Sequence, residues 1–217
     1  MPIGHDPDFN EFARAAQTIG LNITLKTYGQ LGHYARLIRE YNQKINLISR
    51  QDTHRIFTYH IIDSLAAHRF IPQNARCCDL GSGAGLPGIP LALIRPDTAF
   101  ILIESIKKKC RFLEIALKEL DLKNCSIYCE RAETLPPLNC DVILSRLTAP
   151  LEKTVHYAAR HLKPGGAIVL YKTENWPAEI EKKDKIITRY NLQLKNSAII
   201  TLPFSKIERH FLLFTRK

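Results

Sequence analysis

The chain has 217 residues, of which 45% are hydrophobic, so it can form one sizeable α/β core with a small addition, and its composition excludes a disordered chain. Its 31 lysines and arginines against 21 aspartates and glutamates give a net charge of +10, spread along the sequence. This charge predicts either a basic face for a phosphate-rich partner or a uniformly solvated cationic surface. No stretch is apolar over the length of a membrane span, so we expect no membrane partner.

The first 70 residues are predicted to be helical. Apolar residues recur there at spacings of three or four, as on one face of a long helix, and these are Leu25, Tyr28, Leu31, Tyr34, Ile38, Tyr41 and Ile45. A second helix is expected over residues 53–70, with Asp52 as its N-cap and Pro72 just beyond its end. We therefore divide the chain into an N-terminal helical region, 1–70, and a second domain, 71–217.

From residue 76 onward, β-branched runs alternate with helical periodicity. Strands are expected at residues 76–80, 99–104, 126–130, 141–145, 167–172, 197–202 and 210–216. Helices are expected at residues 106–120, 151–162 and 177–190. This alternation predicts the α/β class, with a doubly wound, mostly parallel sheet of seven strands. The last two strands are joined by a short loop, so the sheet should end in an antiparallel hairpin.

The cysteines show no paired C-x-x-C spacing of the kind that binds zinc. The first residues also contain no apolar leader that would direct the chain to an oxidising compartment. We therefore expect a cytoplasmic protein with no bound metal and six free thiols, at positions 77, 78, 110, 125, 129 and 140. Cys77, Cys78 and Cys110 lie in apolar patterns and should fill the core.

The segment CCDLGSGAGLPG, residues 77–88, places four glycines directly behind the first expected strand. In open α/β sheets nucleotides bind at this turn, and glycine permits the ligand to approach the backbone closely. A dinucleotide fold would have the pattern G-x-G-x-x-G/A, but Leu86 occupies the sixth position. The pattern is instead D-x-G-x-G-x-G, and the carboxylate of Asp79 would favour the cationic methionine moiety of S-adenosylmethionine. No Gly-Lys-Ser/Thr follows, which excludes a P-loop.

Two further segments lie where a bound nucleotide would extend. Glu104 ends the second expected strand, 23 residues after Gly81, where a carboxylate can accept both hydroxyl protons of a ribose. The alternative is an exposed acid at the end of a strand. Arg131, Ala132 and Glu133 follow the third expected strand, where an adenine base would lie in this architecture.

Several of these segments together are similar to a known family. They are DLGSGAGLPGIPLALIRPD (79–97), LIESIKKKCRFLE (102–114), ERAETL (130–135), DVILSRLTAP (141–150) and LKPGGAIVLYK (162–172), with YNQKINLI (41–48) and YHIIDSL (59–65) upstream. In this order they resemble the GidB/RsmG family of bacterial small-subunit ribosomal RNA methyltransferases. The resemblance implies a Rossmann-like class I S-adenosylmethionine methyltransferase domain at 71–217. It also implies transfer of a methyl group to N7 of a guanine in 16S ribosomal RNA.

The resemblance implies roles for individual residues as well. S-adenosylmethionine would be bound by Asp79, Gly81, Gly83, Gly85, Leu86, Glu104, Ala132, Glu133 and Arg146. Arg146 would also be the active-site arginine, while Arg131 and Lys172 match two further basic positions that we assign to RNA binding. The chain departs from the usual alanine of the family at Leu147 and from its usual glycine at Thr173.

The residues after the fourth expected strand agree with N7 as the acceptor. Guanine N7 presents an unprotonated lone pair, so its methylation requires alignment of donor and acceptor and no general base. An enzyme for an exocyclic amine often has Asn/Asp-Pro-Pro-aromatic here, whereas this chain has Ser145-Arg146-Leu147-Thr148. A pyrimidine C5 enzyme would need a cysteine nucleophile, but Cys140 lies at the opposite end of the strand. Arg146 can stack on a base, reach guanine O6 or clamp a phosphate, and the alternative is a structural salt bridge.

The other basic residues have two interpretations each. Lys107, Lys108 and Lys109 open an expected helix, where their charge opposes the helix dipole, so they face either RNA phosphate or solvent. Arg131 either binds RNA or pairs with a neighbouring glutamate. Lys172 faces either phosphate or solvent.

His60, Asp63 and Ser64 have the composition of a hydrolase triad, but they lie within five residues on one expected helix and cannot converge on a point. We expect His60 and Asp63 to fix the helical region against the sheet.

Three other functions remain as alternatives. A nicotinamide-dependent oxidoreductase is disfavoured by Leu86. A methyltransferase for another RNA, a protein or a small molecule would share the cofactor loop, but a protein or small-molecule substrate would leave the charge of +10 unexplained. A non-catalytic ribosome-binding factor would keep the fold but would not bind the cofactor. We expect a monomer that acts on small-subunit ribosomal RNA, either naked or in the assembled subunit.

Overall fold

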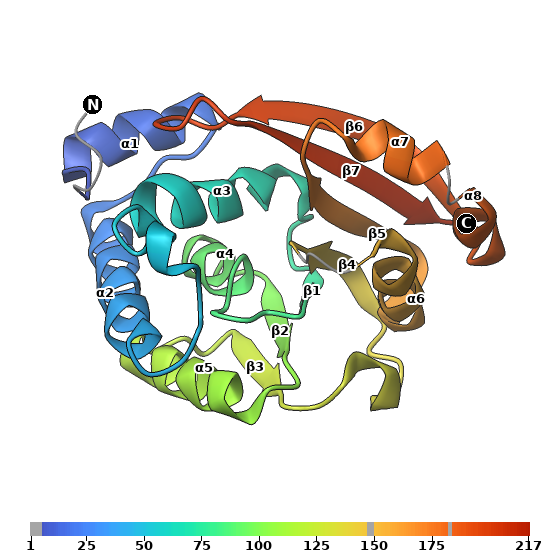
Figure 1. Ribbon diagram of the computed structural model, residues 1–217, viewed down its shortest axis with the longest axis horizontal. Coiled ribbons are helices and arrows are strands. Elements are labelled where there is room, and N and C mark those ends of the chain that lie inside the picture. Colours follow the sequence, from blue (N-terminus) through green and yellow to red (C-terminus); the bar gives the residue numbers. More distant parts are fainter. Residues whose placement is uncertain (1–5, 147–149, 182–183) are drawn as a thin grey trace.

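The computed structural model describes residues 6–146, 150–181 and 184–217, and its centre is a seven-stranded sheet (Figure 1). The spatial order is β3-β2-β1-β4-β5-β7-β6. The bounds are β1 Arg76–Leu80, β2 Ala99–Ile103, β3 Cys125–Tyr128, β4 Cys140–Ser145, β5 Leu162–Lys172, β6 Leu192–Thr201 and β7 Glu208–Arg216. Strands β1 to β5 pair in parallel, whereas β7 pairs antiparallel with both β5 and β6. The predicted α/β class, the mostly parallel sheet and the antiparallel C-terminal hairpin are therefore confirmed.

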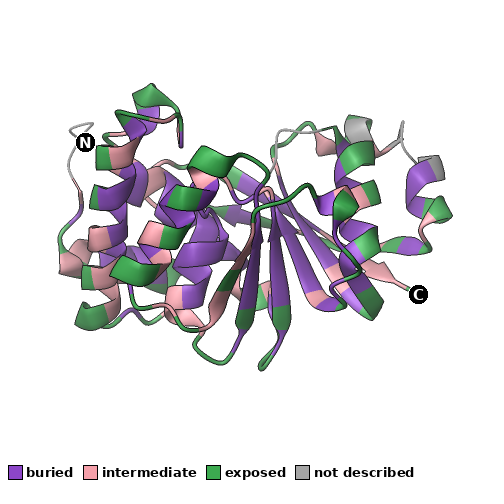
Figure 2. Cartoon of the chain, turned by 90° about the horizontal axis from the view of Figure 1, so that it is seen from below, coloured by how far each residue is buried: buried purple, intermediate pink, exposed green. Residues whose placement is uncertain are grey.

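Successive side chains of the strands enter two different apolar clusters. In β1, Cys77 belongs to the first cluster and Cys78 to the second. In β4, Val142 and Leu144 belong to the first cluster, whereas Ile143 belongs to the second. Because side chains alternate across a sheet, the two clusters lie on its two faces, and both faces are removed from water (Figure 2). This double burial explains the continuous apolar runs of the central strands.

Helices cover both faces of the sheet (Figure 1). Helices α4 (Gly88–Ile94) and α5 (Lys107–Glu119) supply side chains to the first cluster, together with the N-terminal helices. Helices α6 (Leu151–His161), α7 (Trp176–Glu181) and α8 (Asp184–Arg189) supply side chains to the second. The molecule thus has three layers, and the C-terminal ends of β1, β2, β3 and β4 meet at one edge between the two helical layers.

The N-terminal region begins with α1 (Phe9–Thr18) and α2 (Leu25–Asn42), and each of these helices starts at a capping side chain. Asp8 accepts a hydrogen bond from the backbone N–H of Glu11 at 2.9 Å, and Thr24 accepts one from Thr27 at 3.1 Å. Helix α2 matches the first helix predicted from periodicity. Helix α1 lies within the predicted helical region, although the sequence analysis named no separate helix there.

The single second helix predicted for residues 53–70 was wrong. Asp52, the predicted N-cap, lies in the preceding 3₁₀ turn η1 (Arg50–Asp52). The segment itself forms a π-helical turn η2 (Ile56–Ile61), the short α3 (Ile62–Leu65) and a 3₁₀ turn η3 (Ala66–Phe70). Periodicity predicts a helical segment but does not distinguish α-helix from its wider and tighter variants. The wide turn contains His60, and Asp63 lies in the short α3 that follows it. His60 contacts Arg146, just after β4, and Asp63 binds Arg209 of β7.

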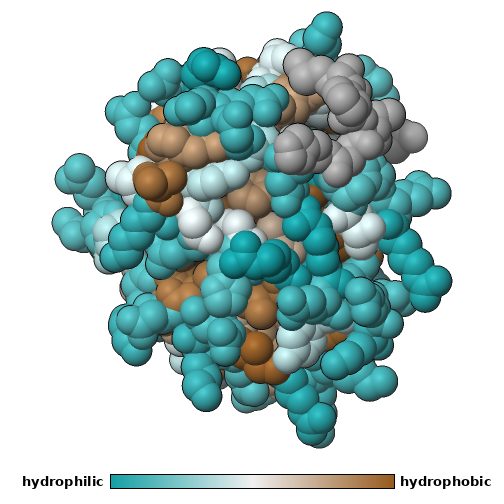
Figure 3. Space-filling model, turned by 90° about the vertical axis from the view of Figure 1, so that its left-hand side faces the viewer, coloured by the Kyte–Doolittle hydropathy of each residue, from teal (hydrophilic) through white to brown (hydrophobic). Residues whose placement is uncertain are grey.

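The N-terminal helices share one core with the sheet. Leu31, Tyr34 and Ile38 of α2 are completely buried and belong to the same cluster as Leu86 and Ile89 beside the first strand. Seen from the side that carries α1 and α2, the outer surface is mainly hydrophilic, with isolated apolar areas (Figure 3). The division of the chain after residue 70 stays a prediction, but the packing across it is continuous.

The prediction of six free thiols was wrong for two of them. Cys110 of α5 and Cys129, directly after β3, form a disulfide across 19 residues of sequence, with 5.8 Å between their Cα atoms. Sequence spacing gave no sign of this pair because the fold alone brings the start of α5 beside the end of β3. The other four cysteines are free, and Cys77, Cys78 and Cys140 are buried.

Two connections differ from the strict alternation of strand and helix. Between β3 and β4 the chain forms only a 3₁₀ turn, η4 (Ala132–Thr134), and no α-helix. The helix expected at residues 177–190 is found as α7 and α8, with residues 182 and 183 outside the described part of the chain. No helix among the described residues is long and apolar enough to span a membrane.

Candidate functional site

The turn between β1 and α4 is tethered to the neighbouring strand β2. The backbone N–H groups of Gly81 and Ser82 both donate to the carbonyl of Ile103 at 2.9 Å. Gly83 has a φ of +57°, a conformation that side chains rarely adopt, and a Cβ at this position would meet only open space and the Gly81 carbonyl. The absence of a side chain at Gly83 therefore leaves room on the side of the loop that faces the cavity described below.

The other two glycines of the motif serve the protein's own packing. A Cβ on Gly85 would lie 2.5 Å from a side-chain carbon of Ile89, and one on Gly88 would lie 2.3 Å from Leu102. The sequence analysis assigned Gly85 to the cofactor loop, but its close neighbours are apolar side chains of α4 and α5. The motif thus combines two glycines that border the cavity with two that let α4 approach the sheet.

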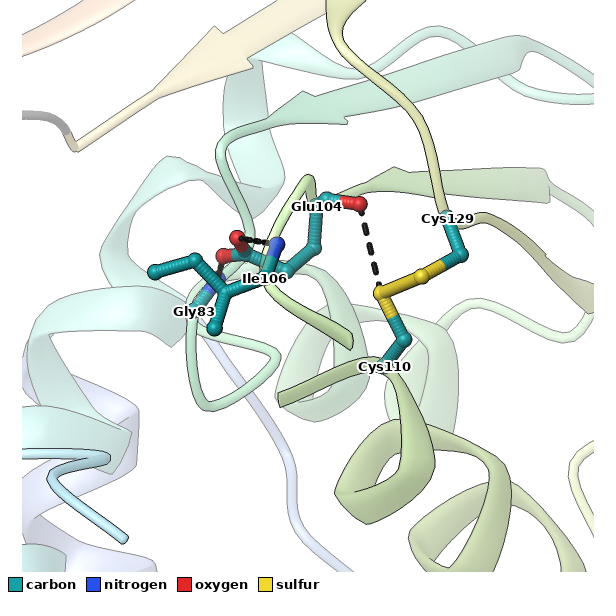
Figure 4. Close-up of a disulfide and its surroundings, with 5 residues drawn as sticks. All are labelled: Gly83, Glu104, Ile106, Cys110 and Cys129. Carbon is teal, nitrogen blue, oxygen red and sulfur yellow. Dashed lines mark hydrogen bonds between the residues drawn. A yellow bond between two sulfur atoms is a disulfide. The ribbon is translucent and has the colours of Figure 1, made fainter. Parts of the chain in front are cut away.

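Glu104 follows β2, and its carboxylate is held between two backbone N–H groups (Figure 4). Oε2 accepts a hydrogen bond from Gly83 at 2.9 Å, and Oε1 accepts one from Ile106 at 2.8 Å. The residue is almost completely buried yet lines the cavity. A carboxylate has about four lone-pair sites, so each oxygen retains capacity for a ligand hydroxyl.

Helix α2 fixes the loop from its other side. Tyr34 is completely buried, and its hydroxyl donates to the carbonyl of Ala84 at 2.6 Å. Burial raises the pKa of this phenol well above its usual value, so the hydroxyl keeps its proton. The conformation of the glycine loop therefore depends on a residue 50 positions earlier in the chain.

A cavity of about 430 Å³ lies at the C-terminal ends of β1, β2 and β3. Of the predicted site residues, Gly81, Gly83, Glu104, Lys109, Arg131, Ala132 and Glu133 line it. The sequence analysis missed Ser105, Ile106, Glu130 and Tyr157, which also line it. The first three adjoin predicted site residues in the sequence. Tyr157 comes from α6, and only the apolar periodicity of that helix placed it near the sheet.

The disulfide lies beside this cavity. Cys110 follows the cavity residue Lys109, and Cys129 precedes the cavity residue Glu130, so the bond ties two segments of the lining together. The sulfur of Cys110 also lies 3.3 Å from the main-chain oxygen of Glu104 (Figure 4). The lysines on this helix differ in position, since Lys107 and Lys108 are exposed whereas Lys109 is half-buried at the cavity.

Asp79 does not line the cavity but lies beneath the loop. It is 1% exposed, and its Oδ2 accepts a hydrogen bond from Gly88 at 2.9 Å while Oδ1 has no hydrogen-bond partner. Burial raises the pKa of this carboxyl to about 7, against the opposing effects of the Gly88 N–H, Arg146 and Ser82. A nearby cation would favour the ionised form of this carboxyl.

Arg146 also lies outside the cavity lining. It follows β4, and its guanidinium contacts Asp63 at 3.2 Å, in the helical region before β1. Asp63 in turn binds Arg209 of β7 at 2.7 Å, so this carboxylate ties the helical region to the sheet, as the sequence analysis expected. The sequence analysis did not identify Arg209. Leu147, the predicted departure from the family, lies outside the described residues.

The remaining predicted residues are separate from the cavity. Lys172 ends β5 and is half-buried, and its carbonyl accepts a hydrogen bond from Arg209. Leu86 is buried in the first apolar cluster. Among the described residues no group of three or more histidine, cysteine or acidic side chains is arranged to hold a metal ion.

The sequence model of one protein family matches residues 27–210, and the family is described as GidB, rRNA small subunit methyltransferase G. The chain belongs to this family. A ribosomal RNA small subunit methyltransferase G of Chlorobium phaeobacteroides is 40% identical over 163 residues, covering 74% of this chain and 73% of that protein. Its counterpart in Chlorobaculum tepidum is 35% identical over 195 residues, covering 88% of each chain. Membership in the GidB family confirms the predicted class of enzyme, an rRNA methyltransferase.

Solved structures confirm the fold. M. jannaschii TYW2 in complex with AdoMet has a TM-score of 0.57 at 16% identity, covering 72% of this chain and 74% of that one. A SAM-dependent methyltransferase from Aquifex aeolicus has a TM-score of 0.57 at 13% identity, covering 82% and 98%. The GidB family member therefore has the Rossmann-like architecture of S-adenosylmethionine methyltransferases.

The raised pKa of Asp79 predicts a specific pH dependence of stability. Between about pH 4 and pH 7 the folded state holds a proton on Asp79 that the unfolded chain releases, so this group's contribution to stability falls as the pH rises. We compare the free energies of unfolding of Asp79→Asn and the parent at each pH. From pH 5 to pH 8 we expect their difference to change by about 3 kcal/mol in favour of the variant, because only the parent loses stability through this carboxyl.

Urea unfolding of both proteins across this range measures the difference. His60, whose pKa is lowered to about 4 by burial and by Arg146, has the opposite pH dependence, but it is present in both proteins and cancels. A difference that stays constant with pH would show that Asp79 titrates at its ordinary value.

Proposed function

We propose that this protein transfers a methyl group from S-adenosylmethionine to N7 of a guanine in 16S ribosomal RNA. The observation that carries the proposal is the Glu104 carboxylate, which faces the cavity directly beside the open glycine Gly83. The reaction takes place where ribosomal subunits are made, so we place the protein in the cytoplasm. We also expect it to act as a monomer.

The residues of the cavity fit the adenosine part of the donor. The two oxygens of Glu104 can accept the two hydroxyl protons of a ribose, and their backbone partners Gly83 and Ile106 fix the direction of the carboxylate. Ile106, which is 49% exposed, and Ala132 both line the cavity, so an adenine ring would meet apolar surface. Oδ1 of Asp79 has no hydrogen-bond partner, and a cationic ligand bound near the loop would favour the ionised form of this carboxyl, whose pKa burial raises to about 7.

The chain's part in the reaction is to bind and orient. S-adenosylmethionine supplies the electrophilic methyl group, and guanine N7 supplies the lone pair, so neither requires a proton acceptor from the protein. Arg146 lies at the end of β4, on the same edge of the sheet as the cavity, and its guanidinium can contact guanine O6 or a phosphate. In this proposal it holds the base in line with the donor.

The positive charge supports an RNA substrate. Lys107 and Lys108 are exposed at the start of α5, next to the cavity. A second hollow of about 610 Å³, between the end of α2 and η1, is lined by Arg39, Asn42, Gln43, Arg50, Thr53 and His54 and offers further basic groups for phosphates. Arg131 is 75% exposed at the rim of the cavity, although it lies 3.7 Å from Glu133.

Cofactor binding can be tested at the loop and at the acid. We expect Gly83→Val to block the ligand sterically and Glu104→Gln to weaken binding by about 1.5–3 kcal/mol through the loss of a charge-assisted hydrogen bond. Calorimetry with S-adenosylhomocysteine measures both affinities, and urea unfolding separates them from strain at the positive φ of Gly83. Glu114→Gln, on the exposed side of α5, is the matched control. Unchanged affinity in both folded variants would assign the loop to another ligand.

RNA binding is expected to depend on salt. Replacing Lys107 and Lys108 together by glutamine should weaken binding and lower the slope of log affinity against log salt by about 1 to 2, because fewer counterions are released. Lys109→Gln is made separately, since this residue lines the cavity and should instead change cofactor affinity. The control replaces the exposed Lys195 and Lys217. An unaltered salt slope in the first variant would make these lysines a solvated surface only.

The acceptor atom and the role of Arg146 can be tested together. The resemblance counts Arg146 among the cofactor residues, but it lies outside the cavity lining, so we expect Arg146→Ala to bind cofactor normally and to lose most of its turnover. Arg146→Lys should recover little, because an ammonium lacks the planar guanidinium. Methylation at N7 makes guanine cationic and labile, so borohydride followed by aniline should cleave the product RNA at one site. Methylated RNA that resists cleavage would exclude N7 as the acceptor atom. Wild-type turnover of Arg146→Ala would exclude a role of this arginine in orienting the base.

A further inference from the structure

The guanidinium of Arg146 is bound along one edge by the helical region before β1. Nη1 donates to Oδ2 of Asp63 at 3.2 Å and to the carbonyl of His60 at 3.5 Å, and Nη2 donates to Nδ1 of the His60 ring at 3.2 Å. A guanidinium has five N–H groups. Within the described part of the chain, the Nε–H and one Nη2–H of Arg146 have no partner.

Asp63 cannot move to follow Arg146, because a second arginine holds it from the other side. Its Oδ1 accepts from Nε of Arg209 at 2.7 Å and its Oδ2 accepts from Nη2 at 3.1 Å, a two-point contact that fixes the carboxylate plane. Asp63 is 1% exposed, so water does not compete for these oxygens. The position of Arg146 is therefore set by Asp63, which is itself set by β7.

His60 supports Arg146 as a neutral ring. Since Nδ1 accepts a hydrogen bond from Arg146, the ring carries its proton on Nε2, which lies 3.3 Å from a carboxylate oxygen of Asp52. Burial and the charge of Arg146 lower the pKa of His60 to about 4, so the ring is uncharged near neutral pH and can accept. The π-helical turn η2 contains His60, and such turns are frequent at functional sites.

The free edge of Arg146 matches one feature of the proposed acceptor. On its major-groove edge guanine presents N7 and O6 as acceptors, whereas adenine presents an amino group in place of O6. When N7 is the methylated atom its lone pair is occupied, so the donors of Arg146 are left for O6. An arginine turned far from this orientation would weaken the contact, because guanidinium hydrogen bonds are directional.

We propose that His60 and Asp63 are positioning residues that hold one edge of Arg146 so that its other edge is presented to the acceptor guanine. The proposal rests on the role of Arg146 in the proposed function. It assigns to the YHIIDSL segment a part in orienting the substrate, in addition to its part in packing the helical region on the sheet.

A double-mutant cycle on single-turnover methyl transfer tests the proposal. The variants are His60→Leu, Arg146→Ala and both together, with labelled S-adenosylmethionine and small ribosomal subunits as substrate. We expect His60→Leu to slow transfer by about 10-fold or more while S-adenosylhomocysteine affinity stays within about twofold. The double variant should be no slower than Arg146→Ala alone, because His60 acts through the arginine. A double variant slowed by the product of the two factors would overturn the proposal.

Two further variants separate positioning from general stability. His60→Asn keeps a neutral acceptor near the position of Nδ1 and should recover much of the rate, whereas no recovery would contradict the proposed contact. His68→Leu is the matched control in the same region, since it removes the contact of that ring with the carbonyl of Ile19 and should lower the urea midpoint without slowing transfer. If His68→Leu slowed transfer as much as His60→Leu does, the slowing in both variants would be due to lost stability, and this would contradict the positioning role of His60.

Asp63→Asn completes the test. It should slow transfer in the same non-additive way and lower the urea midpoint further, because Arg209 also loses its charged partner. If this variant does not fold, the His60 series decides. Wild-type turnover of Arg146→Ala would refute the proposed role of the arginine, whereas slow turnover of Arg146→Ala with additive losses would refute only the positioning by His60 and Asp63.

Discussion

The buried carboxylate of Asp63 is the point at which three parts of the chain are joined. It accepts from Arg209 of β7 and from Arg146 at the end of β4, while its own backbone belongs to α3. One negative charge between two guanidinium groups is tolerable inside a protein only when the groups are close and well oriented. The Asp63 carboxylate therefore links the helical region, the end of β4 and the C-terminal hairpin in the folded protein.

Around this junction the cavity is built from segments that are short and individually weak. The glycine loop is tethered to β2 through Ile103, to Glu104 through Gly83, and to α2 through Tyr34. The disulfide joins the lining segments that follow β2 and β3. A site intended to align two substrates benefits from such rigidity, because the catalytic contribution of alignment is lost when the bound groups can move.

The sequence predicted those features that depend on local pattern. The burial of β1 and β4 on both faces follows from their apolar runs, and the position of Glu104 follows from its distance to the glycine motif. What could not be predicted depends on contacts between distant residues. The disulfide, the role of Arg209 and the bond from Tyr34 to Ala84 link residues 19, 146 and 50 positions apart, and no spacing in the sequence marks them.

The glycine motif shows the same limit within one segment. All four glycines look alike in the sequence, but only atomic positions reveal that a side chain at Gly85 or Gly88 would collide with Ile89 or Leu102. For His60 and Asp63 there was a usable signal, since two polar residues interrupt an otherwise apolar helical face. Such an interruption indicates a buried polar partner, although it does not identify the partner.

The packing of α2 has a consequence for how this protein can be divided. Excising the sheet domain after residue 70 would remove Leu31, Tyr34 and Ile38 from the first apolar cluster and expose part of that cluster to water. It would also remove the hydroxyl that binds the Ala84 carbonyl and the Asp63 carboxylate that pairs with Arg146 and with the buried Arg209. The helical region is therefore part of the same folded core as the sheet. Fusion partners or truncations are better placed before α1 than between the two predicted domains.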